Sequence, residues 1–178
     1  NLRDIERTGD IRSYKKDLVD LYVNRDQHSF STQVTDLDNI QNPSIHSLLS
    51  SKYHEAQMYR LNIHAEIPDP VTHNYLTDLD LAVVLGHLMD NAIDGARKAS
   101  EGFISLAYFD EEDCQSFIIE STIADEQVPL SMMSTQTPHP EGGIGVNAVQ
   151  DILERYPNTS FSVRSQNHKM MQILEMRP

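Results

Sequence analysis

The chain has 178 residues, a hydrophobic fraction of 39% and a net charge of −13 at pH 7, which is enough apolar material for one core of ordinary domain size. The acidity argues against nucleic-acid binding, because such binding needs a basic surface for the phosphate backbone. No run approaches the roughly 18 apolar residues of a membrane span, so we expect no membrane contact within these residues. The single cysteine, Cys114, excludes an intramolecular disulfide and suits a reducing cytoplasm, where we expect the chain to be located.

The first third of the chain is predicted to be helical. Residues 10–25 and residues 44–60 each repeat apolar side chains at helical spacing, and the polar residues 26–42 between them favour a turn. The first stripe contains Ile11, Tyr14, Leu18, Leu21 and Tyr22, and the second contains Ile45, Leu48, Leu49, Tyr53, Ala56 and Tyr59. From the pattern alone, this is equally a surface helical hairpin with no role beyond packing.

A strand and a long helix follow. Residues 61–67 alternate apolar and polar side chains, which is typical of a half-buried strand, and residues 77–99 favour a helix that Thr77 and Asp80 cap. Its apolar stripe contains Leu81, Leu85, Leu88, Ala92 and Ala96. A second stripe beside the first is polar and contains His87, Asp90, Asn91 and Asp94. Such a stripe is either the border of a binding site or the solvated face of an amphipathic helix.

The rest of the chain alternates hairpins with one loop and one helix. Residues 103–109 and 116–122 are predicted strands joined by an acidic turn, and residues 123–141, with three prolines, favour a long functional loop. A glycine-rich turn over residues 141–146 opens a helix that we expect to end near residue 156. A closing hairpin follows, with strands over residues 159–164 and 170–176. This order predicts a two-layer α/β sandwich with a mixed, mostly antiparallel sheet.

Two motifs together suggest a family. A glycine-rich turn before a helix points free backbone N–H groups at a phosphate. Together with residues 88–94 (Leu-Met-Asp-Asn-Ala-Ile-Asp), the turn resembles the G2 box and N box of the GHKL ATPase superfamily. The pair is most similar to sensor histidine kinases that read peptide pheromones in Gram-positive bacteria. This resemblance covers residues 40–178 and implies a Bergerat-type ATP-binding fold.

The resemblance also implies an ATP site that contains Mg²⁺. Asn91 would coordinate the magnesium ion through its amide oxygen, and Asp90 would act as general base. The residues expected to bind the cofactor are His87, Asn91, Asp94, Asp125, Gly143 and Gly145. Loop 123–141 would be a lid that the nucleotide orders.

The chain departs from the superfamily pattern around this site. The adenine-reading Asp-x-Gly-x-Gly box is absent from residues 120–125, where Asp125 is the candidate substitute. The lid has glutamine in Ser-Thr-Gln, residues 134–136, where the family often has lysine. Arg97 or Lys98 could supply the missing cation, or could simply complement the end of their helix. His87 replaces an asparagine, and imidazole is a poor magnesium ligand.

The activity implied is transfer of the γ-phosphoryl group of ATP to a histidine on a dimerisation helix, and from there to a response regulator. The family's acceptor motif, His-Asp-x-x-Asn, is absent, and His54-Glu55 is its nearest imitation. Residues 1–42 would then be a remnant of the dimerisation region of a membrane-anchored homodimer, and residues 43–178 the catalytic domain. Two alternatives are a degenerate, nucleotide-sensing or nucleotide-free interaction module, and a GHKL hydrolase of the chaperone or mismatch-repair type.

Overall fold

The structure of the chain, a computed structural model, describes residues 36–126 and 145–178. The predicted helix over residues 10–25, most of the predicted loop over residues 123–141, and Gly143 lie outside the described residues. The proposed domain boundary after residue 42 stays a prediction. Residues just before it contribute to the described core, since Leu37 and Ile40 are buried and Ile40 forms a β-bridge with Val71.

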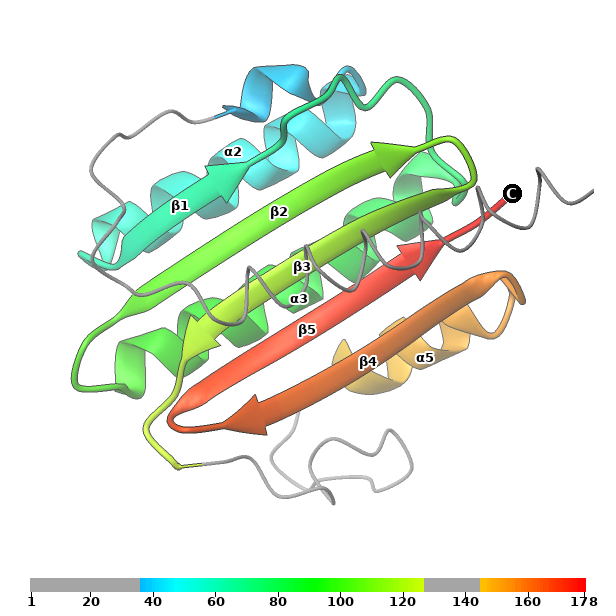
Figure 1. The fold of residues 1–178 in the computed structure, drawn as a ribbon. Helices are drawn as coiled ribbons and strands as arrows, with labels where there is room; N and C mark the ends of the chain where they lie inside the picture. The colour runs from blue at the N-terminus through cyan, green and yellow to red at the C-terminus, as the bar shows by residue number, and fades with distance from the viewer. Residues whose placement is uncertain (1–35, 127–144) are drawn as a thin grey trace, which may run out of the picture. The chain divides into compact units, whose positions relative to one another are not determined.

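Five strands form one mixed sheet in the order β1-β2-β3-β5-β4 (Figure 1). The strands are β1 (Asn62–Glu66), β2 (Phe103–Glu111), β3 (Cys114–Thr122), β4 (Thr159–Gln166) and β5 (Lys169–Met176). Only β1 and β2 pair in parallel, and the other three pairs are antiparallel. The predicted hairpins and the mixed, mostly antiparallel sheet are therefore confirmed.

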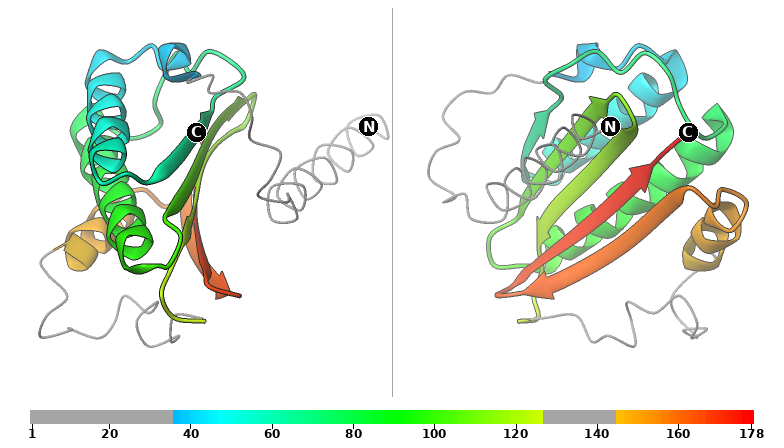
Figure 2. Two further views of the ribbon diagram at one scale, coloured as in Figure 1. Left: turned by 90° about the vertical axis from the view of Figure 1, so that its left-hand side faces the viewer. Right: turned by 45° about the vertical axis from the view of Figure 1, so that its right-hand side comes forward.

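The helices of residues 36–126 and 145–178 lie on one face of this sheet (Figure 2). They are η2 (Asp36–Asn39), α2 (Pro43–Met58), α3 (Asp78–Lys98) and α5 (Gly145–Leu153). Figure 2 shows α2, α3 and α5 in one layer beside the strands, with α3 between the other two. The predicted two-layer α/β sandwich is confirmed. In the described part of the chain, none of the helices is long and apolar enough to cross a membrane.

The core lies between the helical layer and the sheet. The predicted apolar stripe of α3 is almost fully buried, as are the strand residues that face it. These strand residues are Ile104, Leu106, Phe117, Ile119 and Leu174. Burying one such side chain contributes roughly 1.5–3 kcal/mol relative to leaving it in water, so this contact fixes α3 on the sheet. The helix cannot rotate to expose more of its polar stripe without losing these contacts.

Local chemistry sets where the helices begin. The side chain of Asn42 accepts hydrogen bonds from the backbone N–H groups of Ser44 and Ile45, and Pro43 occupies the first helical turn of α2. Thr77 caps α3 as predicted, because its Oγ1 accepts from the N–H of Asp80 at 3.3 Å. These two caps explain why the predicted starts of both helices are correct to within one residue.

The turns and one helix end differ from the predictions. The hairpin between β2 and β3 turns over Glu112 and Asp113 alone, so both strands are longer than expected. The closing hairpin turns over Asn167 and His168, whose φ angles of 52° and 59° fit the two-residue turn that matches strand twist. Helix α5 ends at Leu153, three residues before its predicted end.

Candidate functional site

The predicted polar stripe of α3 lies beside the buried apolar stripe of the same helix. His87 and Asp90 are half-buried, whereas Asn91 and Asp94 are exposed. The buried stripe beside them holds the helix in one rotational position, so these four side chains occupy a defined line along the helix. The structure therefore brings four of the predicted site residues together on one element.

Asn91 is tied to the sheet. Its side-chain Nδ2 donates to Oε1 of Gln172 at 3.4 Å, and Gln172 Nε2 donates to the backbone carbonyl of Leu88 at 3.0 Å. Gln172 lies on β5 and is only 2% exposed. Sequence reasoning missed this residue. The signal available was a polar side chain at an inward position of an otherwise apolar strand.

Asp90 is bound by a lysine from the neighbouring helix. Lys52 Nζ on α2 lies 2.6 Å from Asp90 Oδ1 and 2.9 Å from Glu55 Oε2. Partial burial alone would lower the pKa of Lys52, but its hydrogen bonds to Asp90 and Glu55 raise that pKa above the ordinary value of 10.5. Lys52 is therefore a fully charged cation next to the stripe. Sequence analysis did not single it out, although it falls three residues after Leu49 on the inward side of α2.

The end of α3 holds Arg97, one of the two cations expected as a substitute for the lid lysine. Arg97 lies over the ring of Tyr59, with its guanidinium carbon 3.9 Å from the ring centroid, and 3.9 Å from Asp94. Both contacts keep the Arg97 side chain against α2 and α3. Of the two interpretations offered by the sequence, this geometry favours a role at the helix end.

The segment after β3 lies close to α3. A Cβ atom on Gly95 would lie 3.0 Å from Ile123 Cγ2, which is tighter than most Cβ contacts, so a larger residue here would require its neighbour to shift. Asp125 follows two residues later and is exposed. Gly145 is the first residue of α5, as the phosphate-binding interpretation requires. The predicted roles of Asp125 and Gly145 stay predictions.

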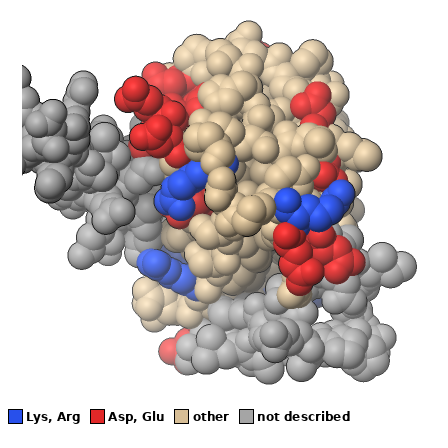
Figure 3. Space-filling model, turned by 90° about the vertical axis from the view of Figure 1, so that its right-hand side faces the viewer, with Lys and Arg blue, Asp and Glu red and all other residues tan. Residues whose placement is uncertain are grey.

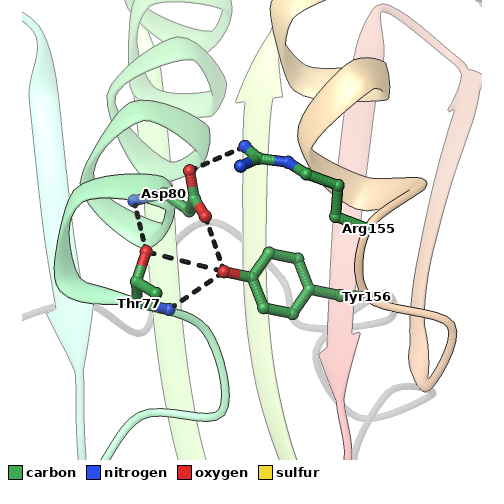
Figure 4. A network of polar contacts seen from close by, with 4 residues as sticks. All are labelled: Thr77, Asp80, Arg155 and Tyr156. Atoms are coloured by element: carbon green, nitrogen blue, oxygen red, sulfur yellow. Dashed lines mark hydrogen bonds and ion pairs between the residues drawn. The ribbon is translucent and has the colours of Figure 1, made fainter.

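A polar network joins the start of α3 to the residues that follow α5 (Figure 4). The carboxylate of Asp80 accepts from Tyr156 Oη at 2.5 Å and from Arg155 at 2.8 Å, and the hydroxyl of Tyr156 accepts from the N–H of Thr77 at 3.3 Å. The carboxylate of Asp80 therefore joins the cap at Thr77, which the sequence suggested, to the residues that follow α5. The hydrogen bond from Tyr156 is the main reason that the pKa of Asp80 is lowered.

The donor set of the stripe suits magnesium better than a transition metal. Among residues 36–126 and 145–178, no group of three histidine, cysteine or acidic side chains could hold a metal ion. Magnesium needs no such cage, since it keeps several waters and is bound by one or two protein oxygens together with substrate phosphates. The exposed amide of Asn91 fits that requirement.

Acidic residues outnumber basic ones in the sequence, 27 to 14. Figure 3 shows acidic side chains in clusters on one face, some of them beside basic side chains. A cavity of about 260 Å³ lies between α5 and β4 and contains no residue of the polar stripe. Its lining residues are Val149, Gln150, Leu153, Glu154, Thr159 and Phe161.

Comparison with known proteins gives the family. Residues 76–177, more than half of the chain, match the model of the GHKL domain family, so the chain belongs to this family. The match begins at the end of the loop that precedes α3 and includes every described residue of the candidate site except Lys52, Glu55 and Tyr59. No curated protein matches the chain in sequence.

Solved histidine kinases share the fold. The catalytic domain of histidine kinase ThkA, in a nucleotide-free form, aligns with a TM-score of 0.63 at 14% identity, over 76% of this chain and 90% of ThkA. Histidine kinase AdeS of Acinetobacter baumannii aligns with a TM-score of 0.57 at 16% identity, over 75% of this chain and 62% of AdeS. Full-length ShkA in complex with AMPPNP aligns with a TM-score of 0.59 at 12% identity, over 82% of this chain and 30% of ShkA.

Proposed function

We propose that the chain is the ATP-binding catalytic domain of a two-component sensor histidine kinase. The observation that supports this most is the placement of Asn91. Its exposed amide lies on the family's central helix, backed by a buried glutamine and next to a carboxylate that a lysine holds. A solvated helix face has no need of a buried amide behind one of its side chains.

The proposed chemistry is phosphoryl transfer, in which the protein mainly positions the reactants and neutralises charge. Asn91 would provide an oxygen ligand to Mg²⁺ on the ATP phosphates, and Asp90 would act as base towards the attacking histidine. Gly145 would present the positive end of α5 to the phosphates. His87, Asp94 and Asp125 would complete the nucleotide site, with Asp125 near the adenine.

The later steps of signalling are implied by the same resemblance. The acceptor histidine would lie on a dimerisation helix outside residues 1–178, because none of the eight histidines stands in His-Asp-x-x-Asn. The whole protein would be a membrane-anchored homodimer whose catalytic domain acts in the cytoplasm. It would pass its phosphoryl group to a response regulator. The motifs over residues 88–94 and 141–146 favour the peptide-pheromone receptors within this class.

One observation favours the second candidate, a nucleotide-free interaction module. Two cations beside the stripe, Lys52 and Arg97, are both engaged by acidic side chains of this chain, so neither is free to neutralise a phosphate. A phosphate would then depend on Mg²⁺ and on backbone N–H groups for its neutralisation. The two candidates therefore differ in whether magnesium makes ATP bind.

Titration of the chain with ATP, with Mg²⁺ and with a chelator, tests the proposal. We expect Mg²⁺ to strengthen ATP binding, and we expect Asn91→Ala to abolish this enhancement with little loss of stability, because Asn91 is exposed and its truncation leaves no cavity. Asn158→Ala is the matched control, since Asn158 is an exposed asparagine in the loop before β4. If the unaltered chain does not bind ATP with Mg²⁺, the interaction module replaces the kinase domain as the better interpretation.

A further inference from the structure

Gln172 is the one member of the inward row on β5 that contacts the polar side of α3. The row consists of Gln172, Leu174 and Met176, all nearly or fully buried. An amide among such neighbours is costly unless it is hydrogen-bonded, and both ends of this amide are bonded to α3. A leucine at this position would pack as well, so packing alone does not explain the glutamine. Its amide must be explained by the groups that it orients.

The hydrogen bonds fix the direction of both amides. The backbone carbonyl of Leu88 can only accept, so the group that faces it at 3.0 Å must be the NH₂ of Gln172. The oxygen of Gln172 therefore faces Asn91, and an oxygen can be met there only by the NH₂ of Asn91. It follows that Oδ1 of Asn91 is the atom turned away from the sheet. A backbone carbonyl in α3 thus determines, through one buried side chain, which end of Asn91 is available to a ligand.

We propose that Gln172 is a positioning residue for the magnesium ligand Asn91. Resting on the proposed function, this inference assigns a role to a residue that does not itself touch the metal ion or the nucleotide. Without Gln172, the amide of Asn91 would rotate freely and present its oxygen or its NH₂ group to the site. The NH₂ group cannot bind a cation, so part of the population would be unable to bind Mg²⁺.

Cation binding would also strengthen the hydrogen bond between Asn91 and Gln172. Coordination draws electron density from the amide oxygen and makes the N–H groups of the same amide better donors. The 3.4 Å hydrogen bond to Gln172 would then shorten, and the two events would favour one another. Partners of this kind behind a metal ligand typically contribute about 10–100-fold to metal affinity. Because Asn91 would be one of several magnesium ligands, we expect the contact with Gln172 to contribute about tenfold to magnesium affinity.

The test compares Gln172→Met with the unaltered chain. Methionine keeps the length of glutamine and removes its amide. The groups left behind stay satisfied, because Asn91 is exposed to water and a carbonyl within a helix keeps its bond from the N–H four residues on. Gln172→Leu, with a different shape, is a second variant in case the first folds poorly. Gln115→Met is the matched control, since Gln115 is a fully buried glutamine on β3 that contacts Tyr108 and Asp110 instead.

The quantity to compare is the magnesium enhancement, the ratio of the ATP dissociation constants measured with a chelator and with Mg²⁺. We expect it to fall about tenfold in both Gln172 variants and to stay unchanged in Gln115→Met. A purely structural loss would weaken binding under both conditions and leave the ratio unchanged. An unchanged ratio in a folded Gln172 variant therefore overturns the inference.

A spectrum without ligand provides a second readout. The side-chain NH₂ resonance of Asn91, assigned from its loss in Asn91→Ala, should shift in the ¹⁵N–¹H spectrum of the Gln172 variants and stay in place in Gln115→Met. No shift in the Gln172 variants would show that the contact does not hold Asn91, and would overturn the inference while the proposed function stands. If the unaltered chain shows no magnesium enhancement at all, the proposed function fails, and the inference fails with it.

Discussion

The ammonium group of Lys52 lies 2.6 Å from the carboxylate of Asp90, and this contact joins α2 to the polar stripe of α3. The family resemblance implies that Asp90 is the general base, and no sequence pattern places a lysine beside it. The pair leaves the Asp90 side chain about half exposed, at 48%, so the carboxylate is held in place and still accessible to an incoming group. Lys52 also offsets the negative charge that Asp90 would otherwise present to a polyphosphate.

We expect Lys52→Met to weaken binding of Mg·ATP. An unpaired carboxylate beside the phosphates would repel them by about 1 kcal/mol with the screening of bulk water, which is roughly a fivefold loss of affinity. The folded state should lose less, about 0.2–1 kcal/mol, since the pair is partly solvated. Calorimetric titration and urea unfolding measure the two effects separately.

Lys52→Arg and Lys169→Met serve as controls for this prediction. Arginine keeps the positive charge, so affinity should be largely retained. Lys169 pairs with Glu120 on β3 at 3.1 Å, outside the stripe, and its loss should leave nucleotide affinity unchanged. If Lys52→Met binds as tightly as the unaltered chain, Lys52 does not neutralise charge at the site.

The chain should phosphorylate a histidine that is supplied to it and none of its own. His54 is the nearest imitation of an acceptor and is exposed on α2, but it lacks the asparagine that follows in the family motif. Incubation with γ-labelled ATP and a dimerisation hairpin that carries His-Asp-x-x-Asn should place acid-labile label on the hairpin. Label on His54, lost in His54→Gln, would contradict the assignment of the acceptor.

Local signals explain what the sequence could predict. The apolar stripe and the Thr77 cap are patterns within one element, and they predicted α3 and its rotation on the sheet because burial of that stripe decides both. The glycine-rich turn together with residues 88–94 predicted the GHKL family, which the match over residues 76–177 shows. Each of these patterns is formed by residues within a few positions of one another.

The contacts that support the stripe depend on residues far apart in the chain. Asn91 and Gln172 are separated by 81 positions, and Asp80 and Tyr156 by 76. No periodicity relates such positions, because their contact follows from how helices and strands pack. The two-residue turns were mispredicted for a related reason, since strand pairing extended across residues whose polarity favoured a loop. The site could be predicted as a stripe on α3, and its supporting residues could not.

The network at the start of α3 should make stability depend on pH in the acid range. Hydrogen bonds from Tyr156, Thr77 and Arg155 lower the pKa of Asp80 below its ordinary value of 3.8. The ionised form is favoured by folding, so its contribution is fully present above 3.8 and is lost as the pH falls through the lower, folded-state pKa. The difference in free energy of unfolding between the unaltered chain and Asp80→Asn should be constant from about pH 7 to about pH 5, and shrink below about pH 4.

Urea unfolding of both proteins across this range checks the prediction, with Asp78→Asn as the comparison. Asp78 also has a lowered pKa, through hydrogen bonds from Asn42 and Asn74, but it lies outside the network. Tyr156→Phe should remove most of the pH dependence assigned to Asp80, because the hydrogen bond from Tyr156 is its largest cause. A difference between the unaltered chain and Asp80→Asn that grows with acidity would show that the carboxylate is not stabilised by folding.

Two glycines within α3 should respond differently to alanine. A Cβ on Gly86 would meet only Leu48 Cδ1 at 3.8 Å, an ordinary contact, so Gly86→Ala should raise the free energy of unfolding by about 0.5–1 kcal/mol through helix propensity. A Cβ on Gly95 would lie 3.0 Å from Ile123 Cγ2 and 3.4 Å from the carbonyl oxygen of Thr122. Either the helix or the segment after β3 would have to move, which offsets the gain in propensity. Gly95→Ala should therefore stabilise less than Gly86→Ala, or destabilise. Urea unfolding of the two variants measures the contrast, and equal gains would show that α3 does not need its close approach to β3.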